Sequence, residues 1–508
     1  MPAKHDSILD NGHWEKNRSN INLTATNEHN EPPLQAPSTA GRPFNHKDWI
    51  PESPGSAVRA LLRVLTPSIL EPSRAPPKSL RSTAYLDGLR GFAALMVYLG
   101  HHQAWAHELS SSGVVAEHAY GYSKRFFFIC LPGIRIFFSG GHVSVCIFFV
   151  ISGYVLAAKP LALIQAGDRL KLADNLGSAL FRRWLRLYIP VLGTTFLFMT
   201  SWHAFGIWTA WPKHQADYRH ECWEWYAAVK NYSFVFKGTG EPWLSYNFHA
   251  WSIPTEFRGS LVIYTSLLAF SRATRNARLW CQLGLIFYFL YIVDGWFCAL
   301  FSAGMLLCDL DLLAKADNLP DLFGRLKKFR EVIFINLFIV GMYLGGVPHA
   351  NTDIDLLKVQ PGWYYLALLK PQAVWDYKWF YLFFASVLIV GSIRHLKWLR
   401  RFFELRFNLY LGRISFALYL VHGPVLWTLG DRLYAAVGWA RESHREGIPA
   451  WVDYYPMSKA GPFGMELSFV AVHLVLFPVT LWLAEIATKV FDEPSIQFSQ
   501  WAYRRTLG

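Results

Sequence analysis

The sequence of 508 residues is poor in charged side chains. They make up 17% of the chain, whereas soluble domains usually carry about 25%. Hydrophobic residues make up 53% of it. Many of them lie in apolar runs whose length is close to the roughly 20 residues that a helix needs to cross a bilayer. Length alone would suggest two or three soluble domains. The apolar runs override that interpretation and predict a multi-pass membrane protein.

Cysteine motifs are also missing. The six cysteines show no CxxC pair and no spacing typical of a metal site. Most of them lie in apolar runs, where a cysteine serves as a small core residue. We therefore expect neither a disulfide framework nor a zinc site, and no metal or tightly bound cofactor.

The net charge of +13 comes from Lys and Arg placed between the apolar runs. That placement disfavours a nucleic-acid partner, which needs a clustered basic patch. No signal peptide opens the chain, so the first hydrophobic segment should act as an uncleaved membrane signal. Residues 1–84 are polar and hold Pro-bearing stretches, which predicts a disordered cytosolic tail. We expect a transmembrane domain over 85–494 and a short cytosolic C-terminal tail over 495–508.

The apolar runs predict an all-α, polytopic helical bundle of about ten transmembrane helices in the lipid bilayer. The predicted spans lie near 87–106, 143–160, 184–202, 251–271, 280–293, 296–311, 333–348, 377–393, 409–430 and 468–490.

The distribution of Lys and Arg predicts the orientation of these spans. If the N-terminus is cytosolic and the spans alternate, the stretches 159–186, 272–279, 312–330 and 394–413 face the cytosol and hold 20 basic residues. The opposite stretches, together about twice as long, hold only 13. Since cytosolic loops are enriched in Lys and Arg, we expect both termini in the cytosol, in an endomembrane or the plasma membrane. The sequon that begins at Asn231 then faces the other side, as a candidate glycosylation site of a glycoprotein.

The first predicted span carries two ionisable residues, Arg90 and His101, 11 positions apart. On a helix they differ by only about 20° in azimuth and lie about 16 Å apart along the axis. They are either a snorkelling arginine and an interfacial histidine, or a functional pair, since an ionisable residue deep in a span is costly.

Other polar residues lie in or next to the spans. Ser152 suits close helix packing, and a nucleophilic hydroxyl is the alternative. Arg182 and Arg186 are four positions apart at the cytosolic end of the third span, where they either follow from orientation or bind an anionic ligand. Glu256 is a candidate base or partner of a histidine, or a structural ion-pair partner. His422 lies two residues before Pro424, as a second site residue or a core histidine.

The motifs that carry these residues resemble, in their order, those of the acyltransferase 3 family of integral-membrane O-acyltransferases. The matching pieces are LDGLRGFAALMVYLGHH, FFVISGYVLA, RRWLRLYIP, WSIPTEFRGSLVIY, GRISFALYLVHGP and DEP. The spacing of ten residues between Arg90 and His101 is the most specific of them. The long polar tail and the aromatic-rich stretch 203–250 are similar to the fungal stand-alone type.

The resemblance implies transfer of an acyl group, commonly acetyl from acetyl-CoA, to a hydroxyl of a glycan or a small natural product. It implies that His101 is catalytic, that Arg90 is essential, and that Glu256 is the family's glutamate. Phe257 and Arg258 stand where some members have a larger aromatic residue or a second carboxylate, which leaves the acceptor pocket open.

The physical reading of the residues agrees with this chemistry. We expect Arg90, Arg182, Arg183 and Arg186 to hold the phosphates of acyl-CoA at a cytosolic mouth, because guanidinium groups suit phosphates. His101 would then act as a general base or briefly carry the acyl group, with Glu256 orienting it. A transporter or proton-coupled permease that uses the same buried Arg, His and Glu is the alternative.

Overall fold

The computed structural model describes residues 54–70, 80–107, 119–122, 125–126, 128–236, 243–349, 352–462 and 465–507. All of them belong to the larger of two units of the chain, Pro33–Gly508. The described part is helical apart from one antiparallel pair of two-residue strands, β1 (Gly121–Tyr122) and β2 (Arg125–Phe126). The predicted all-α membrane fold is confirmed.

Each of the ten predicted spans coincides with a helix. These helices are α2 (Ala84–Ala106), α6 (Gly141–Gln165), α7 (Arg169–Phe205), α9 (Ser252–Ala269), α10 (Arg275–Phe287), α11 (Trp296–Lys315), α13 (Arg330–Leu344), α16 (Tyr377–Ile393), α18 (Arg406–Val425) and α21 (Leu467–Ala487). The other α-helices of the described residues are α1 (Pro54–Leu65), α5 (Ile136–Ser139), α8 (Tyr218–Ser233), α12 (Asp321–Leu326), α14 (Ile354–Lys358), α15 (Tyr364–Ala367), α17 (Lys397–Phe403), α19 (Asp431–Ala436), α20 (Glu442–Gly447) and α22 (Glu493–Arg505).

Four of the described helices are long and apolar enough to cross a membrane: 141–165, 296–315, 406–436 and 467–505. The last two continue through π-helical turns into α19 and α22. The pair α16 and α17, bent by 98°, counts as a fifth candidate. The protein is thus an integral membrane protein, and the number of about ten spans stays a prediction, because the other helices are shorter or more polar.

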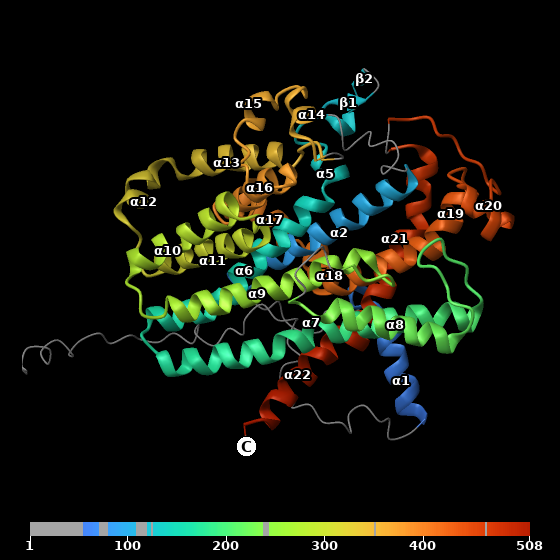
Figure 1. Ribbon diagram of the computed structural model, residues 1–508, viewed down its shortest axis with the longest axis horizontal. Helices are drawn as coiled ribbons and strands as arrows, with labels where there is room; N and C mark the ends of the chain where they lie inside the picture. The colour runs from blue at the N-terminus through green and yellow to red at the C-terminus, as the bar shows by residue number, and fades with distance from the viewer. Residues whose placement is uncertain are drawn as a thin grey trace, which may run out of the picture. The chain divides into compact units, whose positions relative to one another are not determined.

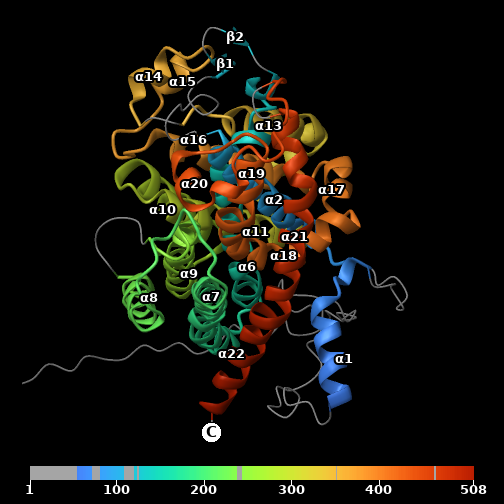
Figure 2. The same cartoon turned by 90° about the vertical axis from the view of Figure 1, so that its right-hand side faces the viewer.

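Figures 1 and 2 show α2, α6, α11 and α18 in the middle of the bundle. Helices α2 and α18 run parallel, since Arg90 donates to the Gly412 carbonyl over 2.7 Å and His101 lies 2.8 Å from His422. Glycine permits their close approach. A Cβ atom on Gly91 would lie 2.3 Å from the backbone nitrogen of Gly412. This contact fixes the position of Arg90 and His101 against α18.

The packing expected around Ser152 is also present. A Cβ atom on its neighbour Gly153 would lie 2.0 Å from the carbonyl oxygen of Phe301, so α6 meets α11 backbone to backbone. The small side chains of this motif therefore allow close packing between the two helices, as predicted.

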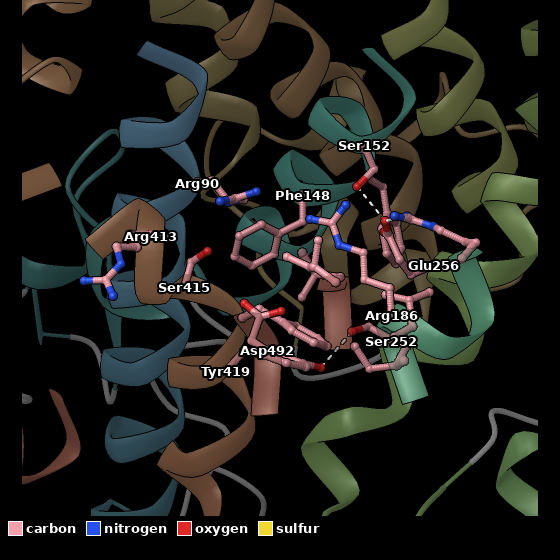
Figure 3. A pocket seen from close by; sticks show the side chains of 17 residues that line it. Arg90, Phe148, Ser152, Arg186, Ser252, Glu256, Arg413, Ser415, Tyr419 and Asp492 are labelled. Atoms are coloured by element: carbon pink, nitrogen blue, oxygen red, sulfur yellow. Dashed lines mark hydrogen bonds and ion pairs between the residues drawn. The ribbon is translucent and has the colours of Figure 1, made fainter. Parts of the chain in front are cut away.

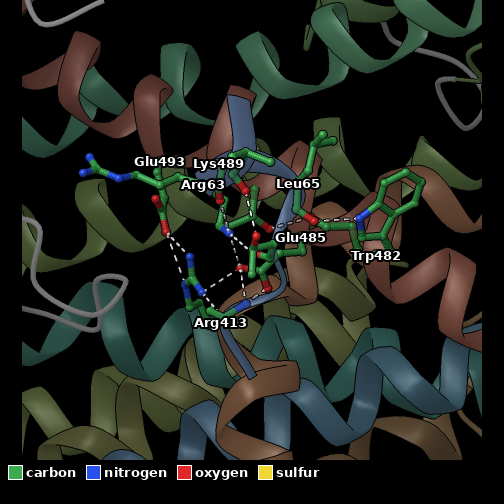
Figure 4. Close-up of polar contacts among 12 residues, drawn as sticks. Arg63, Leu65, Arg413, Trp482, Glu485, Lys489 and Glu493 are labelled. Carbon is green, nitrogen blue, oxygen red and sulfur yellow. Dashed lines mark hydrogen bonds and ion pairs between the residues drawn. The ribbon is translucent and has the colours of Figure 1, made fainter. Parts of the chain in front are cut away.

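The predicted limits of the transmembrane domain differ from the elements found. Helix α1 and the turn to residue 70 lie in the stretch expected to be disordered, and Figure 4 shows them held against the end of α21. The Lys489 ammonium donates to the carbonyls of Arg63 and Thr66 over 2.9 and 2.6 Å, and the Trp482 indole donates to that of Leu65 over 2.9 Å. Helix α22 continues through the limit expected at residue 494. The rest of the tail, 1–53 and 71–79, lies outside the described residues.

Candidate active site

A cavity of about 940 Å³, counting its open mouth, lies between α2, α6, α7, α9, α18 and the start of α22 (Figure 3). Its charged lining residues are Arg90, Arg183, Arg186, Arg413, Glu256 and Asp492. Its hydroxyl-bearing lining residues are Ser152, Ser252, Ser415 and Tyr419. Four arginines against two carboxylates give the cavity a positive lining, which suits a polyanionic ligand.

Three of the four arginines expected to bind phosphates line this cavity, namely Arg90, Arg183 and Arg186. Arg182 is not among the lining residues of this cavity, and its contact with phosphates stays a prediction. Its Nε atom donates to the carbonyl oxygen of Ser178, one turn earlier on α7, over 3.0 Å. Arg182 and Arg183 are about 100° apart on the helix, so only one of these two neighbours can point straight into the cavity.

Glu256 also lines the cavity, but its partners differ from the expected one. It forms an ion pair with Arg183 and accepts a hydrogen bond from the Ser152 hydroxyl over 2.6 Å. Among the described residues no hydrogen bond joins Glu256 to His101, so the carboxylate does not orient that imidazole here. Its position instead fixes the guanidinium of Arg183, which also donates to Ser260 over 2.8 Å.

His101 has a histidine as its partner. Its Nδ1 atom lies 2.8 Å from Nε2 of His422, and Nδ1 of His422 lies 3.1 Å from the Leu418 carbonyl oxygen. A carbonyl oxygen can only accept, so Nδ1 of a neutral His422 carries the proton and its Nε2 is an acceptor. His101 must then donate from Nδ1, which leaves the lone pair on its Nε2. His422 thus occupies the position beside His101 that was expected of Glu256.

A third histidine, His249, was not predicted from the sequence. It precedes α9, its side chain is buried, and its ring centroid lies 3.9 Å from that of His101 and 4.8 Å from that of His422. The ring packs directly on α18, where a Cβ atom on Gly423 would lie 2.5 Å from Nδ1 of His249. Trp427 stacks on His249 at 5.1 Å. We refer to His101, His249 and His422 as the histidine cluster.

Three clustered histidines raise the question of a metal ion, since one nitrogen of each lies within 4.8 Å of the others. In a tetrahedral zinc site with Zn–N bonds of about 2.0–2.1 Å, ligand nitrogens lie about 3.3 Å apart. The His101–His422 separation of 2.8 Å is instead that of a hydrogen bond. The donor set fits a hydrogen-bonded pair better than a metal centre, and the absence of a metal stays a prediction.

Two hydroxyl residues connect the cavity with the histidine cluster. Tyr419 lines the cavity, its hydroxyl donates to the carbonyl oxygen of His249, and its ring lies 5.8 Å from that of His422. Ser252, also in the lining, has its hydroxyl 2.8 Å from that of Tyr419 (Figure 3). His101 is not among the lining residues. The cavity therefore meets the cluster at this hydroxyl pair.

Besides His249, sequence reasoning missed several lining residues: Ser252, Arg413, Tyr419 and Asp492. All four lie inside the motifs given above. Two of these motifs drew attention to other residues, Glu256 and His422, and DEP to none. The available signal was only that all four lie in the ordered motifs. That signal could not be used without knowing which helices are neighbours.

Comparison with known proteins gives relatives over nearly the whole chain. The family model described as an acyltransferase domain matches residues 83–485. The O-acetyltransferase PaAT-1 of Phomopsis amygdali is 30% identical over 90% of this chain and 91% of its own length. The acyltransferase clz18 of Cochliobolus lunatus is 24% identical, covering 82% of this chain and 95% of its own. The acyltransferase R4 of a Phoma species is 22% identical, covering 84% and 97%.

No solved structure shows a significant match to this chain. The family match includes α2 with Arg90 and His101, α9 with Glu256, and α18 with His422. It favours an enzyme over the transporter alternative. The resemblance noted from the motifs is thereby confirmed: the chain belongs to the acyltransferase 3 family and is an acyl-transferring membrane enzyme.

Proposed function

We propose that this enzyme transfers an acetyl group from acetyl-CoA to a hydroxyl of a small natural product or a glycan. The observation that carries the proposal is the arrangement along α2 and α18, which lead from an arginine-lined cavity at one end to a hydrogen-bonded histidine pair at the other. A negatively charged donor and a base for a hydroxyl acceptor are the two requirements of such a transfer.

The donor would bind in the cavity. The phosphates of acyl-CoA are strongly anionic, and Arg90, Arg183 and Arg186 supply charge-assisted hydrogen-bond donors for them. Glu256 holds Arg183 in place through their ion pair. The arginines of the cavity lie near the span ends assigned to the cytosol, where acyl-CoA is made. This agreement supports the proposal that both termini are cytosolic.

The acyl transfer would use His101 as general base. Its Nε2 lone pair takes the proton of the acceptor hydroxyl while the oxygen attacks the thioester carbonyl carbon. The C–S bond then breaks, and the CoA thiolate takes up the proton from His101. The products are an ester and free CoA, with no net change in protons. His422 holds the required tautomer through its 2.8 Å contact with Nδ1 of His101.

The acceptor would approach along the aromatic side of the histidine cluster. Phe248 and Trp427 have ring centroids 5.0 Å apart, and Trp427 also stacks on His249. Trp202 and Tyr246 stack nearby at 5.8 Å. Flat aromatic surfaces suit an apolar ring system or the face of a sugar. The relative from Phomopsis amygdali, named an O-acetyltransferase, supports a hydroxyl acceptor and acetyl as the transferred group.

The test is a reconstitution of the full chain in proteoliposomes with acetyl-labelled acetyl-CoA. An extract of cells that lack the protein supplies the acceptor. We expect label in an organic-soluble or glycan ester with the wild type and loss of that product with His101→Ala. Uptake of label without an ester product would favour transport, and an unchanged rate in a folded His101→Ala protein would overturn the proposal. Mass profiling of cells with and without the protein then identifies the acceptor by the missing acetyl mass.

A further inference from the structure

The hydroxyl pair of Tyr419 and Ser252 occupies the position where the donor cavity meets the histidine cluster. We infer that these two hydroxyls bind the thioester carbonyl oxygen of the acyl donor and stabilise the oxyanion that forms on it. This inference rests on the proposed acyl transfer and assigns a further catalytic role within the same site.

The reaction requires such donors. When the acceptor oxygen attacks the thioester, the carbonyl oxygen gains a negative charge, and preorganised hydrogen-bond donors in a water-poor site stabilise it most effectively. Both side chains are nearly buried, Tyr419 with 6% and Ser252 with 7% of its surface exposed. Both line the cavity. Tyr419 also contacts the histidine cluster at the His249 carbonyl and the His422 ring, and Ser252 is joined to the cluster through its hydrogen bond with Tyr419.

The other polar groups of the cavity are less suited to this task. Arg90 donates to the Gly412 carbonyl, at the end of α2 opposite the histidine cluster. Arg183 is paired with Glu256. The Ser415 hydroxyl donates to the same Gly412 carbonyl over 2.9 Å, one turn before Tyr419 on α18. Among the lining hydroxyl residues, Tyr419 contacts the histidine cluster and Ser252 is hydrogen-bonded to Tyr419.

The observed hydrogen bonds show how the pair can act. The Tyr419 hydroxyl donates to the carbonyl of His249, so the hydrogen between the two hydroxyls comes from Ser252. Both O–H groups already donate to oxygen, and rotation about each C–O bond redirects them. The thioester carbonyl then replaces the present acceptors. Ser252 is the first residue of α9 and lies between His249 and Glu256 along the chain.

The step balances with the residues named. The acceptor O–H bond breaks as Nε2 of His101 takes the proton, and the new C–O bond forms while the carbonyl π pair moves onto oxygen. Tyr419 and Ser252 donate to that oxyanion. The carbonyl then re-forms, the C–S bond breaks, and the thiolate receives the proton from His101. No further reactant is needed.

The test compares three variants of the full chain in proteoliposomes: Tyr419→Phe, Ser252→Ala and the control Ser386→Ala. Ser386 is a buried serine of α16 whose hydroxyl donates to the Leu382 carbonyl over 2.8 Å, and it is not among the lining residues of the cavity. With labelled acetyl-CoA and the extract described above, we expect Tyr419→Phe to lower kcat by about 10²-fold, in the range of a lost oxyanion donor. Ser252→Ala should lower it by about tenfold or more, and Ser386→Ala by less than about twofold. The KM for acetyl-CoA should stay within about twofold in all three, because the phosphate contacts are unchanged.

A wild-type kcat in both Tyr419→Phe and Ser252→Ala would overturn the inference, and so would a rise in the KM for acetyl-CoA that accounts for the whole loss. Equal losses in Ser386→Ala would do the same. A variant counts only if its thermal unfolding temperature matches that of the wild type, and Ser252→Ala carries the test if Tyr419→Phe does not fold. Failure of the wild type to transfer acetyl at all would instead refute the proposed function.

Discussion

Nδ1 of His101 lies 2.8 Å from Nε2 of His422, across the interface between α2 and α18. The Leu418 carbonyl accepts a hydrogen bond from Nδ1 of His422, so the proton of His422 is on that nitrogen. Nε2 of His422 then accepts from Nδ1 of His101, which leaves the lone pair of His101 on Nε2. A histidine therefore orients the proposed base, in the place where a carboxylate performs that task in many hydrolases.

Replacing His422 tests this orientation. We expect His422→Ala to lower kcat by about 10–10²-fold, less than the loss in His101→Ala, because the ring of His101 remains but its tautomer is no longer fixed. Steady-state kinetics in proteoliposomes measures both. His395, which stacks on Phe334 instead, provides the control, and His395→Gln should leave kcat unchanged. Equal activity of His422→Ala and the wild type would exclude the orienting role.

The arginines of α7 should differ in their effect on donor binding. Arg186 lines the cavity and Arg182 does not, so Arg186→Ala should raise the KM for acetyl-CoA about tenfold or more, given about 1.5–3 kcal/mol for a hydrogen bond to a charged group. Arg182→Ala should change it by less than about twofold. Similar effects of the two substitutions would contradict the prediction that Arg186, and not Arg182, contacts the donor.

Glu256 should act on donor binding as well. Glu256→Gln removes the charge paired with Arg183, and we expect a higher KM for acetyl-CoA with kcat within about threefold of the wild type, because Glu256 makes no hydrogen bond to His101. The kinetic constants separate the two roles. A collapse of kcat at unchanged KM would restore the carboxylate as a partner of the base.

The close contact of α2 and α18 should make the stability of the protein sensitive to added side-chain volume between these helices. A methyl group on Gly91 would meet the backbone of Gly412 at 2.3 Å, so Gly91→Ala should destabilise the protein by about 1–3 kcal/mol, the usual cost of overpacking. Thermal unfolding in detergent measures this loss. Gly177 on α7 has open space around its Cβ position, and Gly177→Ala should be neutral or slightly stabilising. A neutral Gly91→Ala would show that the two helices can separate.

The sequon at Asn231 reports on orientation. Asn231 is exposed near the end of α8, while the next residue, Tyr232, is buried and donates to the Ala250 carbonyl over 2.7 Å. If both termini are cytosolic, a glycosidase should shift the electrophoretic mobility of the wild type and not that of Asn231→Gln. Asn17→Gln should behave like the wild type. A shift that survives in Asn231→Gln and disappears in Asn17→Gln would reverse the orientation.

The helices and the Arg90–His101 pair could be predicted because they follow from local patterns. Apolar run length predicts a helix, and two residues 11 positions apart share a face of it by helix geometry alone. The partners of His101 depend on which helices are neighbours, which no local pattern contains. Glu256 illustrates this limit: it follows His249 by seven residues, roughly 10 Å along a helix, and this rise carries it from the cluster to the cavity.

Arg413 lines the cavity, and its guanidinium forms ion pairs and a hydrogen bond with residues that are distant in the sequence. Glu485, Glu493 and Ser68 all contact its guanidinium (Figure 4). Two of these, Ser68 and Glu493, lie outside the 83–485 range of the family match. A protein shortened to that range would keep every motif except DEP. It would nevertheless lose the contacts of Arg413 with Ser68 and Glu493, so the guanidinium would be free to turn toward the cavity. Truncation boundaries for this enzyme should therefore fall before residue 54 and after residue 505, the limits of α1 and α22.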